Sequence, residues 1–192
     1  METWIATAKT TEIEELAWAP VAGVITNPTV LLQAGPDWRE TIRTLASYRP
    51  LQPASLERVH LQSIAVEHRE ILKEMEEYAQ LLAPKLLIPK VPMTSGGMAA
   101  ARDLVERGYR VNITALCSLP QVEIALNAGA SYVSMYVARI NDASESGTAG
   151  YQLIEWTREY IDRNGLEAKI MAANVRNVQQ DGKGIRRRGH AA

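Results

Sequence analysis

The sequence predicts an α/β fold of the (β/α)8 TIM-barrel type, incomplete because seven strands and no eighth can be found. Short apolar runs of strand length alternate with amphipathic helical stretches, which is typical of repeated βα units. Polar residues recur where strands are expected to end, at Asn27, Gln62, Lys90, Thr114, Tyr136 and Asn174. A barrel gathers its active site at these strand ends, whereas the alternative, an open doubly wound sheet, concentrates such residues near one switch point.

Seven apolar runs predict the strands, and their composition fits parallel strands that are covered on both faces. In chain order the expected strands are residues 3–8, 21–27, 58–63, 85–91, 109–114, 131–136 and 168–173. The spacing of Ile71, Met75, Tyr78 and Leu82 predicts an amphipathic helix within residues 66–82. Polar residues ahead of helical patterns predict N-caps at Thr10, Ser95 and Ser118.

The apolar periodicity stops after Asn177. We therefore predict an α/β barrel domain over residues 1–177, followed by an irregular basic tail over residues 178–192. Seven strands would leave the edges of the first and the last unpaired, which exposes backbone hydrogen-bonding groups. We expect a truncated or frame-shifted C-terminus, and a natural but unusual ending is the alternative.

Composition and charge narrow the possible partners. The 192 residues are 46% hydrophobic and 22% charged, which is typical of a globular domain, and the formal net charge is -1. This charge gives no reason to expect nucleic acid or an anionic membrane as partner. No apolar stretch is long enough to span a membrane. The single cysteine, Cys117, excludes an internal disulfide and favours a reducing, cytoplasmic location.

No cofactor is expected from the motifs. The histidines His60, His68 and His190 have no metal-ligand spacing, and no Gly-rich phosphate loop is present. We therefore predict that the protein binds neither a metal nor a nucleotide cofactor.

Lys90 is the principal candidate for chemistry. It lies inside the run Leu-Leu-Ile-Pro-Lys-Val-Pro-Met-Thr over residues 86–94. Apolar surroundings disfavour the ammonium form, lower the pKa of lysine and yield a neutral amine that can form a Schiff base. The alternative is a lysine whose stem packs while its head reaches water. Lys85, the nearest rival, precedes the run and is expected to be solvated.

Six motifs resemble those of one enzyme family, in the family's order. They are Gly-Val-Ile-Thr-Asn-Pro-Thr (23–29), Pro-Lys-Val-Pro-Met-Thr (89–94), Asn-Ile-Thr-Ala (112–115), Ala-Gly-Ala-Ser-Tyr-Val-Ser (128–134), Tyr-Val-Ala-Arg-Ile (136–140) and Met-Ala-Ala-Asn-Val-Arg-Asn (171–177). By these motifs the chain resembles the short transaldolase family, and within it the fructose-6-phosphate aldolase branch.

This resemblance implies a reaction and a set of partners. The expected reaction is reversible cleavage of fructose 6-phosphate to dihydroxyacetone and glyceraldehyde 3-phosphate, or a dihydroxyacetone transfer, without a metal. Expected partners are a small-molecule sugar phosphate or hydroxyketone. A homo-oligomer is possible, but we expect its assembly to be weakened. The family commonly assembles through a C-terminal helix, and no such helix is expected in this sequence. The alternative is a catalytically impaired member that at most binds sugar phosphates.

The resemblance also implies roles for individual residues. Lys90 would form the Schiff base, Tyr136 would exchange a proton with the substrate oxygen, and Gln62 would position water without accepting a proton. Thr26 and Thr114 match positions that help orient the lysine and a catalytic water. Asn27 would bind substrate hydroxyls, although an asparagine before proline also commonly satisfies a turn.

The phosphate site and one departure complete the comparison. Arg139 and Arg176 resemble a pair that grips the substrate phosphate by charge-assisted hydrogen bonds, and Asn174 takes the place of a serine beside it. Ala6 stands where the family has an aspartate that relays a proton or binds substrate. The loss of such a group predicts a slow enzyme, unless Tyr136 compensates.

Overall fold

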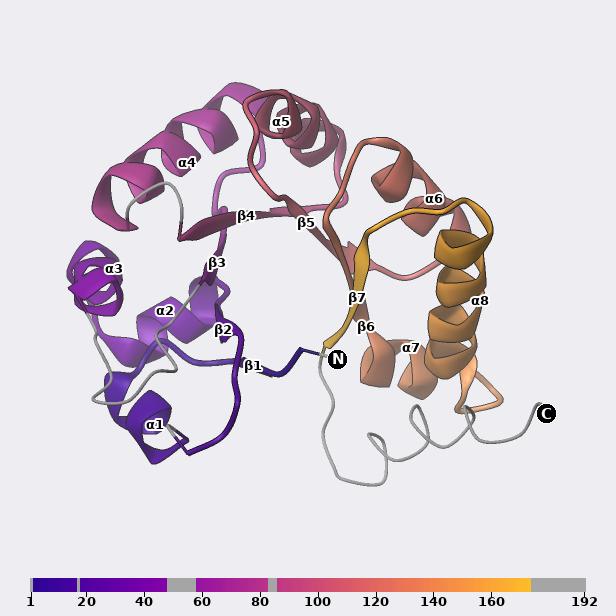
Figure 1. Cartoon of the computed structure of the whole chain (residues 1–192), viewed down its shortest axis with the longest axis horizontal. Helices are drawn as coiled ribbons and strands as arrows, with labels where there is room; N and C mark the ends of the chain where they lie inside the picture. Colours follow the sequence, from indigo (N-terminus) through magenta and orange to yellow (C-terminus); the bar gives the residue numbers. More distant parts are fainter. Residues whose placement is uncertain (1, 17, 48–57, 83–85, 174–192) are drawn as a thin grey trace. The chain divides into compact units, whose positions relative to one another are not determined.

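The computed structural model describes residues 2–16, 18–47, 58–82 and 86–173. The chain divides into two compact units, Met1–Val111 and Asn112–Ala192. Strands and helices alternate in both (Figure 1). The tail over residues 178–192 lies outside the described residues, as do Lys85, Asn174 and Arg176.

The first unit is a parallel sheet of four strands in chain order, with its helices on the outer side (Figure 1). The strands are β1 (Trp4–Ile5), β2 (Gly23–Ile25), β3 (Val59–Gln62) and β4 (Leu87–Pro92). The helices are α1 (Thr10–Glu15), α2 (Pro28–Ala34), α3 (Trp38–Ser47), α4 (His68–Leu82) and α5 (Ser95–Glu106). Gln62 of β3 is the register partner of Lys90 of β4, which sets their side chains side by side on one face.

The second unit repeats the pattern with three parallel strands. They are β5 (Asn112–Leu116), β6 (Tyr132–Tyr136) and β7 (Lys169–Ala173), accompanied by α6 (Leu119–Asn127), α7 (Val137–Ala143) and α8 (Ala149–Arg163). The pairing of β5 with β6 shifts between Ile113 and Leu116, where Ala115 has a left-handed φ of 65°. The strand predicted over residues 109–114 therefore began three residues before β5 and ended two residues before its end, since a bulge carries β5 on to Leu116.

Strand order confirms the predicted fold class. In each unit every strand is parallel to its neighbour, and the spatial order follows the chain. A doubly wound sheet would instead reverse its order at a switch point. The fold is an incomplete arrangement of the TIM-barrel type, with seven strands among the described residues.

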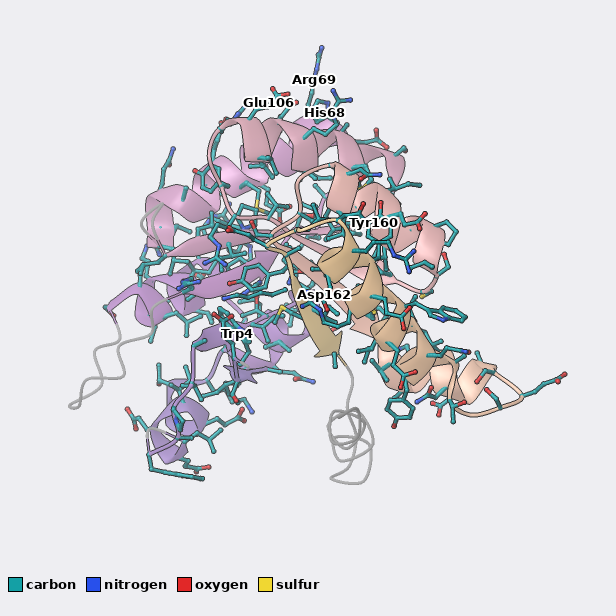
Figure 2. The ribbon with its side chains drawn as sticks, turned by 45° about the vertical axis from the view of Figure 1, so that its right-hand side comes forward. Trp4, His68, Arg69, Glu106, Tyr160 and Asp162 are labelled. Atoms are coloured by element: carbon teal, nitrogen blue, oxygen red, sulfur yellow. The ribbon has the colours of Figure 1, made fainter. Side chains whose placement is uncertain are left out.

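The predicted helical stripe on α4 is also confirmed. Its apolar residues Ile71, Met75, Tyr78 and Leu82 are all buried. At the start of this helix, His68 Nε2 lies 2.8 Å from Asp103 Oδ2 of α5. Figure 2 shows His68 and Arg69 at the outer edge of these two helices, directed away from the strands. This contact links α4 to α5, the two helices that flank β4 in the chain.

Two of the predicted helix caps were wrong by one residue. Thr94, not Ser95, caps α5, and its hydroxyl oxygen accepts a hydrogen bond from the Gly97 amide at 3.0 Å. Helix α1 begins at Thr10, so that Lys9 holds the N-cap position. Ser118 is the N-cap residue of α6 as predicted, although its side chain makes no capping hydrogen bond. Both Thr and Ser are favoured at the N-cap, so composition alone does not choose between the neighbours Thr94 and Ser95.

Candidate active site

Lys90 is held inside the protein. Only 5% of its surface is exposed, and Nζ donates a hydrogen bond to the Thr26 carbonyl oxygen at 3.1 Å. Burial lowers the pKa of Lys90 from 10.5 to about 8, because desolvation penalises the ammonium form. The direction of this shift confirms the expectation from the apolar run. The alternative of a lysine head in open water is wrong.

Thr26 sets the direction of the lysine through its backbone. Its amide and its hydroxyl both donate hydrogen bonds to the His60 carbonyl oxygen, each at 2.9 Å. These two bonds anchor the end of β2 to β3 and hold the Thr26 carbonyl toward Lys90. The hydroxyl of Thr26 is thus engaged with the backbone, and its carbonyl oxygen is the group that contacts the amine.

Gln62 offers a hydrogen-bond acceptor beside the lysine. Its Oε1 atom is buried and has no hydrogen-bond partner within the described parts of the chain. A buried polar atom without a protein partner is uncommon and is often satisfied by water or a ligand. Since Gln62 and Lys90 are register partners, this acceptor lies on the same face as the amine.

The side-chain oxygen of Asn27 caps a helix. Oδ1 accepts a hydrogen bond from the Val30 amide at 2.9 Å, which makes Asn27 the N-cap of α2. Its backbone is extended, with φ -149° and ψ 172°, as expected before proline. The alternative interpretation, in which the side chain of Asn27 satisfies a turn, is therefore correct for its oxygen atom. The amide nitrogen Nδ2 donates no hydrogen bond to any residue that the structure describes.

The second unit carries Thr114, Tyr136 and Arg139. Thr114 is fully buried beside the bulge of β5, and its hydroxyl has no hydrogen-bond partner among the described residues. Tyr136 ends β6 and Arg139 lies in the first turn of α7, with its Cζ atom 5.0 Å from the centre of the tyrosine ring. Arg139 is exposed.

Ala6 follows directly after β1 and is exposed. Its methyl group can neither relay a proton nor bind a hydroxyl group, so nothing at this position replaces the carboxylate of the family pattern.

Sequence reasoning did not identify His60. This histidine of β3 is fully buried, and its ring packs edge-on against Trp4 with the centroids 4.3 Å apart. Burial, followed by the charge of Lys90, lowers the pKa of His60 to about 3, so the ring is neutral. The sequence feature that could have identified it is its position two residues before Gln62. This spacing places both side chains on one face of the strand.

Two kinds of feature are absent from the described residues. No three His, Cys, Asp or Glu residues of the described chain cluster so as to hold a metal ion. None of the helices described is both long and apolar enough to cross a membrane.

These features define a protein class, an α/β protein of the TIM-barrel type with a buried lysine on its fourth strand. Residues 3–181 match the family model described as Transaldolase/Fructose-6-phosphate aldolase. The chain belongs to this family, whose enzymes are of the aldolase and transaldolase class.

Curated relatives agree with this assignment. A "Probable transaldolase" of Alkaliphilus metalliredigens is 35% identical over 180 residues, which cover 93% of this chain and 79% of the relative. A "Probable transaldolase" of Symbiobacterium thermophilum is 34% identical, with 94% and 79% covered. One from Clostridioides difficile is 33% identical, with 92% and 77% covered.

Proposed function

We propose that this chain is a class I aldolase or transaldolase of sugar phosphates that forms a Schiff base at Lys90. The observation that carries the proposal is the buried amine with a pKa near 8. At pH 7 roughly a tenth of such amines are neutral, against about 0.03% for a lysine of ordinary pKa. Only the neutral amine attacks a carbonyl.

The proposed reaction is the reversible cleavage of fructose 6-phosphate. Lys90 Nζ attacks the C2 carbonyl carbon, and loss of water leaves an iminium. A base removes the C4 hydroxyl proton, the C3–C4 bond breaks, and its electron pair forms an enamine as glyceraldehyde 3-phosphate departs. Protonation at C3 and hydrolysis of the iminium then release dihydroxyacetone and the free amine. The iminium is itself the electron sink, so the cycle requires no cofactor.

Individual roles follow from the chemistry and the family pattern. The unpartnered oxygen of Gln62 supports a role in positioning the water that hydrolyses the iminium. Thr114, whose buried hydroxyl also has no partner among the described residues, is proposed for the same water. Tyr136 is proposed to exchange the C4 hydroxyl proton, and Asn27 to donate to a substrate hydroxyl. Arg139 is proposed to bind the phosphate, together with Arg176 and Asn174.

Borohydride trapping tests the proposal. The protein is incubated with dihydroxyacetone or fructose 6-phosphate, reduced, digested and mapped by mass spectrometry. We expect one reduced adduct on Lys90. The matched control is Lys73→Met, which removes an exposed lysine of α4 and should leave the adduct unchanged. A folded sample without an adduct at Lys90 would refute the proposal.

Trapping should also depend on pH. Because burial lowers the pKa of Lys90 to about 8, the initial trapping rate with cyanoborohydride should rise about tenfold per pH unit below pH 8 and level off above it. The measurement is the rate of adduct formation from pH 6 to 9.5, corrected for the reactivity of the hydride reagent on a model imine. A rate that still climbs tenfold per unit at pH 9.5 would mean an ordinary, hydrated lysine.

Ala6 favours a second candidate function. A family member without the carboxylate at this position could form the imine yet fail to turn over, and would then act as a binder of sugar phosphates. The two candidates differ in turnover, not in trapping, so both assays are needed.

A further inference from the structure

The loop between β3 and α4 follows Gln62 directly, and apolar burial does not hold it. Its first residue, Ser63, donates its amide to the Lys90 carbonyl oxygen at 3.0 Å. Beyond it, the side chains of Ile64 and Val66 are 56% and 61% exposed. Apolar side chains that stay in water gain little from packing, so the polar contacts of this segment contribute to fixing its path.

One carboxylate supplies those contacts. Glu74 lies in the second turn of α4, and its two oxygens accept the Ile64 amide at 3.1 and 3.0 Å. One of these oxygens also accepts the Ala65 amide at 3.1 Å. Hydrogen bonds to an ionised carboxylate are stronger than those between neutral groups. Glu74 therefore fixes two successive amides of the loop to the helix.

Tyr78 holds the carboxylate in place. Its hydroxyl donates to Glu74 Oε1 at 2.6 Å, and the tyrosine is fully buried. Burial, followed by this hydrogen bond, raises the pKa of Tyr78, so the phenol keeps its proton and remains a donor. The arrangement is a chain of contacts from the buried phenol through Glu74 to the loop, and the loop begins one residue after Gln62.

We propose that Glu74 is a positioning residue for Gln62, fixing the end of β3 from outside the sheet so that the amide faces the Schiff-base site. This inference rests on the proposed function of Lys90. The pairing of Gln62 with Lys90 fixes the end of β3 against β4, and the hydrogen bonds of Glu74 fix the following loop against α4. Loss of the carboxylate frees the two loop amides and lets the Gln62 side chain move relative to Lys90.

A double-mutant cycle tests the inference. We expect Glu74→Ala to lower kcat for fructose 6-phosphate cleavage about tenfold or more, because small displacements of catalytic groups have large effects. Trapping at Lys90 should change less than twofold. In a Gln62→Ala background, Glu74→Ala should have no further effect, since coupled residues are not additive. Glu74→Gln keeps one acceptor oxygen and should recover part of the loss.

The control is Glu70→Ala on the same helix. It removes the same charge from an exposed residue of α4, whereas the carboxylate hydrogen bonds to the loop described above all come from Glu74, so kcat should stay within twofold. If the effects of Glu74→Ala and Gln62→Ala add, Glu74 merely stabilises the fold and the inference is wrong. Should Glu74→Ala fail to fold, the same cycle with Glu74→Gln decides the question.

A measurement without turnover separates this inference from the proposed function. In NMR spectra, Glu74→Ala should accelerate hydrogen exchange at the Ile64 and Ala65 amides and should shift or broaden the Gln62 side-chain amide signals. An absent Lys90 adduct in the unmodified protein would refute the proposed function. Unchanged Gln62 signals in Glu74→Ala would refute the positioning role, whether or not the protein is active.

Discussion

Replacing Lys90 with methionine is expected to abolish imine formation and, at the same time, to stabilise the fold at neutral pH. The first effect follows because no other amine of the chain is proposed to reach the substrate carbonyl. The second follows because burying a charged ammonium group lowers the free energy of unfolding, and methionine carries no charge. Trapping should fall below detection, whereas the free energy of unfolding should rise.

The size and sign of the stability change come from the pKa shift. The pKa of Lys90 is lowered from 10.5 to about 8, and each unit corresponds to about 1.4 kcal/mol. Below pH 8 the lysine is charged in both the folded and the unfolded chain, so the full penalty of about 3 kcal/mol applies. Between pH 8 and 10.5 the unfolded chain binds more protons, and stability rises with pH. Above pH 10.5 the penalty is gone.

The substitution also removes the hydrogen bond to the Thr26 carbonyl, which is worth about 1 kcal/mol. We therefore expect Lys90→Met to be more stable by about 2 kcal/mol at pH 7, with no gain left above pH 10.5. Urea unfolding at both pH values measures the difference, and Lys73→Met at the exposed position provides the comparison. Equal stability of Lys90→Met and the unmodified chain at pH 7 would show that the amine is hydrated.

The fold and the central lysine were predictable because they depend on short-range patterns. An apolar run of strand length indicates a buried strand wherever it occurs, so all seven strands were placed to within a few residues. The prolines and aliphatic residues around Lys90 predicted its burial for the same reason. Its carbonyl partner on β2 was not predicted, because it is set by the pairing of β2 with β3.

The details of the site depended on contacts that a linear pattern does not show. Asn27 had two consistent roles, and only the position of the Val30 amide decided how its oxygen is used. The bulge after Thr114 places an alanine at positive φ, which local sequence gives no reason to expect. The sequence analysis made no prediction for Glu74, whose contact with Ile64 joins two residues ten positions apart in the chain.

Substituting Ala6 with aspartate is expected to have the second large effect, on turnover alone. A general acid–base group typically contributes about 10²–10⁴-fold, so Ala6→Asp should raise kcat for fructose 6-phosphate cleavage by that order if the chain is impaired. Since Ala6 is exposed, the carboxylate can be solvated at little expense to folding. Glyceraldehyde 3-phosphate release, coupled to its dehydrogenase, measures the rate.

The matched control is Ala6→Asn, which has the shape of aspartate but cannot carry the proton. If the proton relay is what the chain lacks, the asparagine variant should stay near the activity of the unmodified protein, while its adduct at Lys90 forms normally. Equal gains from both variants would assign the missing function to substrate hydrogen bonding instead. An unmodified chain that already turns over as fast as Ala6→Asp would mean that the carboxylate is dispensable here, with Tyr136 the proposed source of the proton.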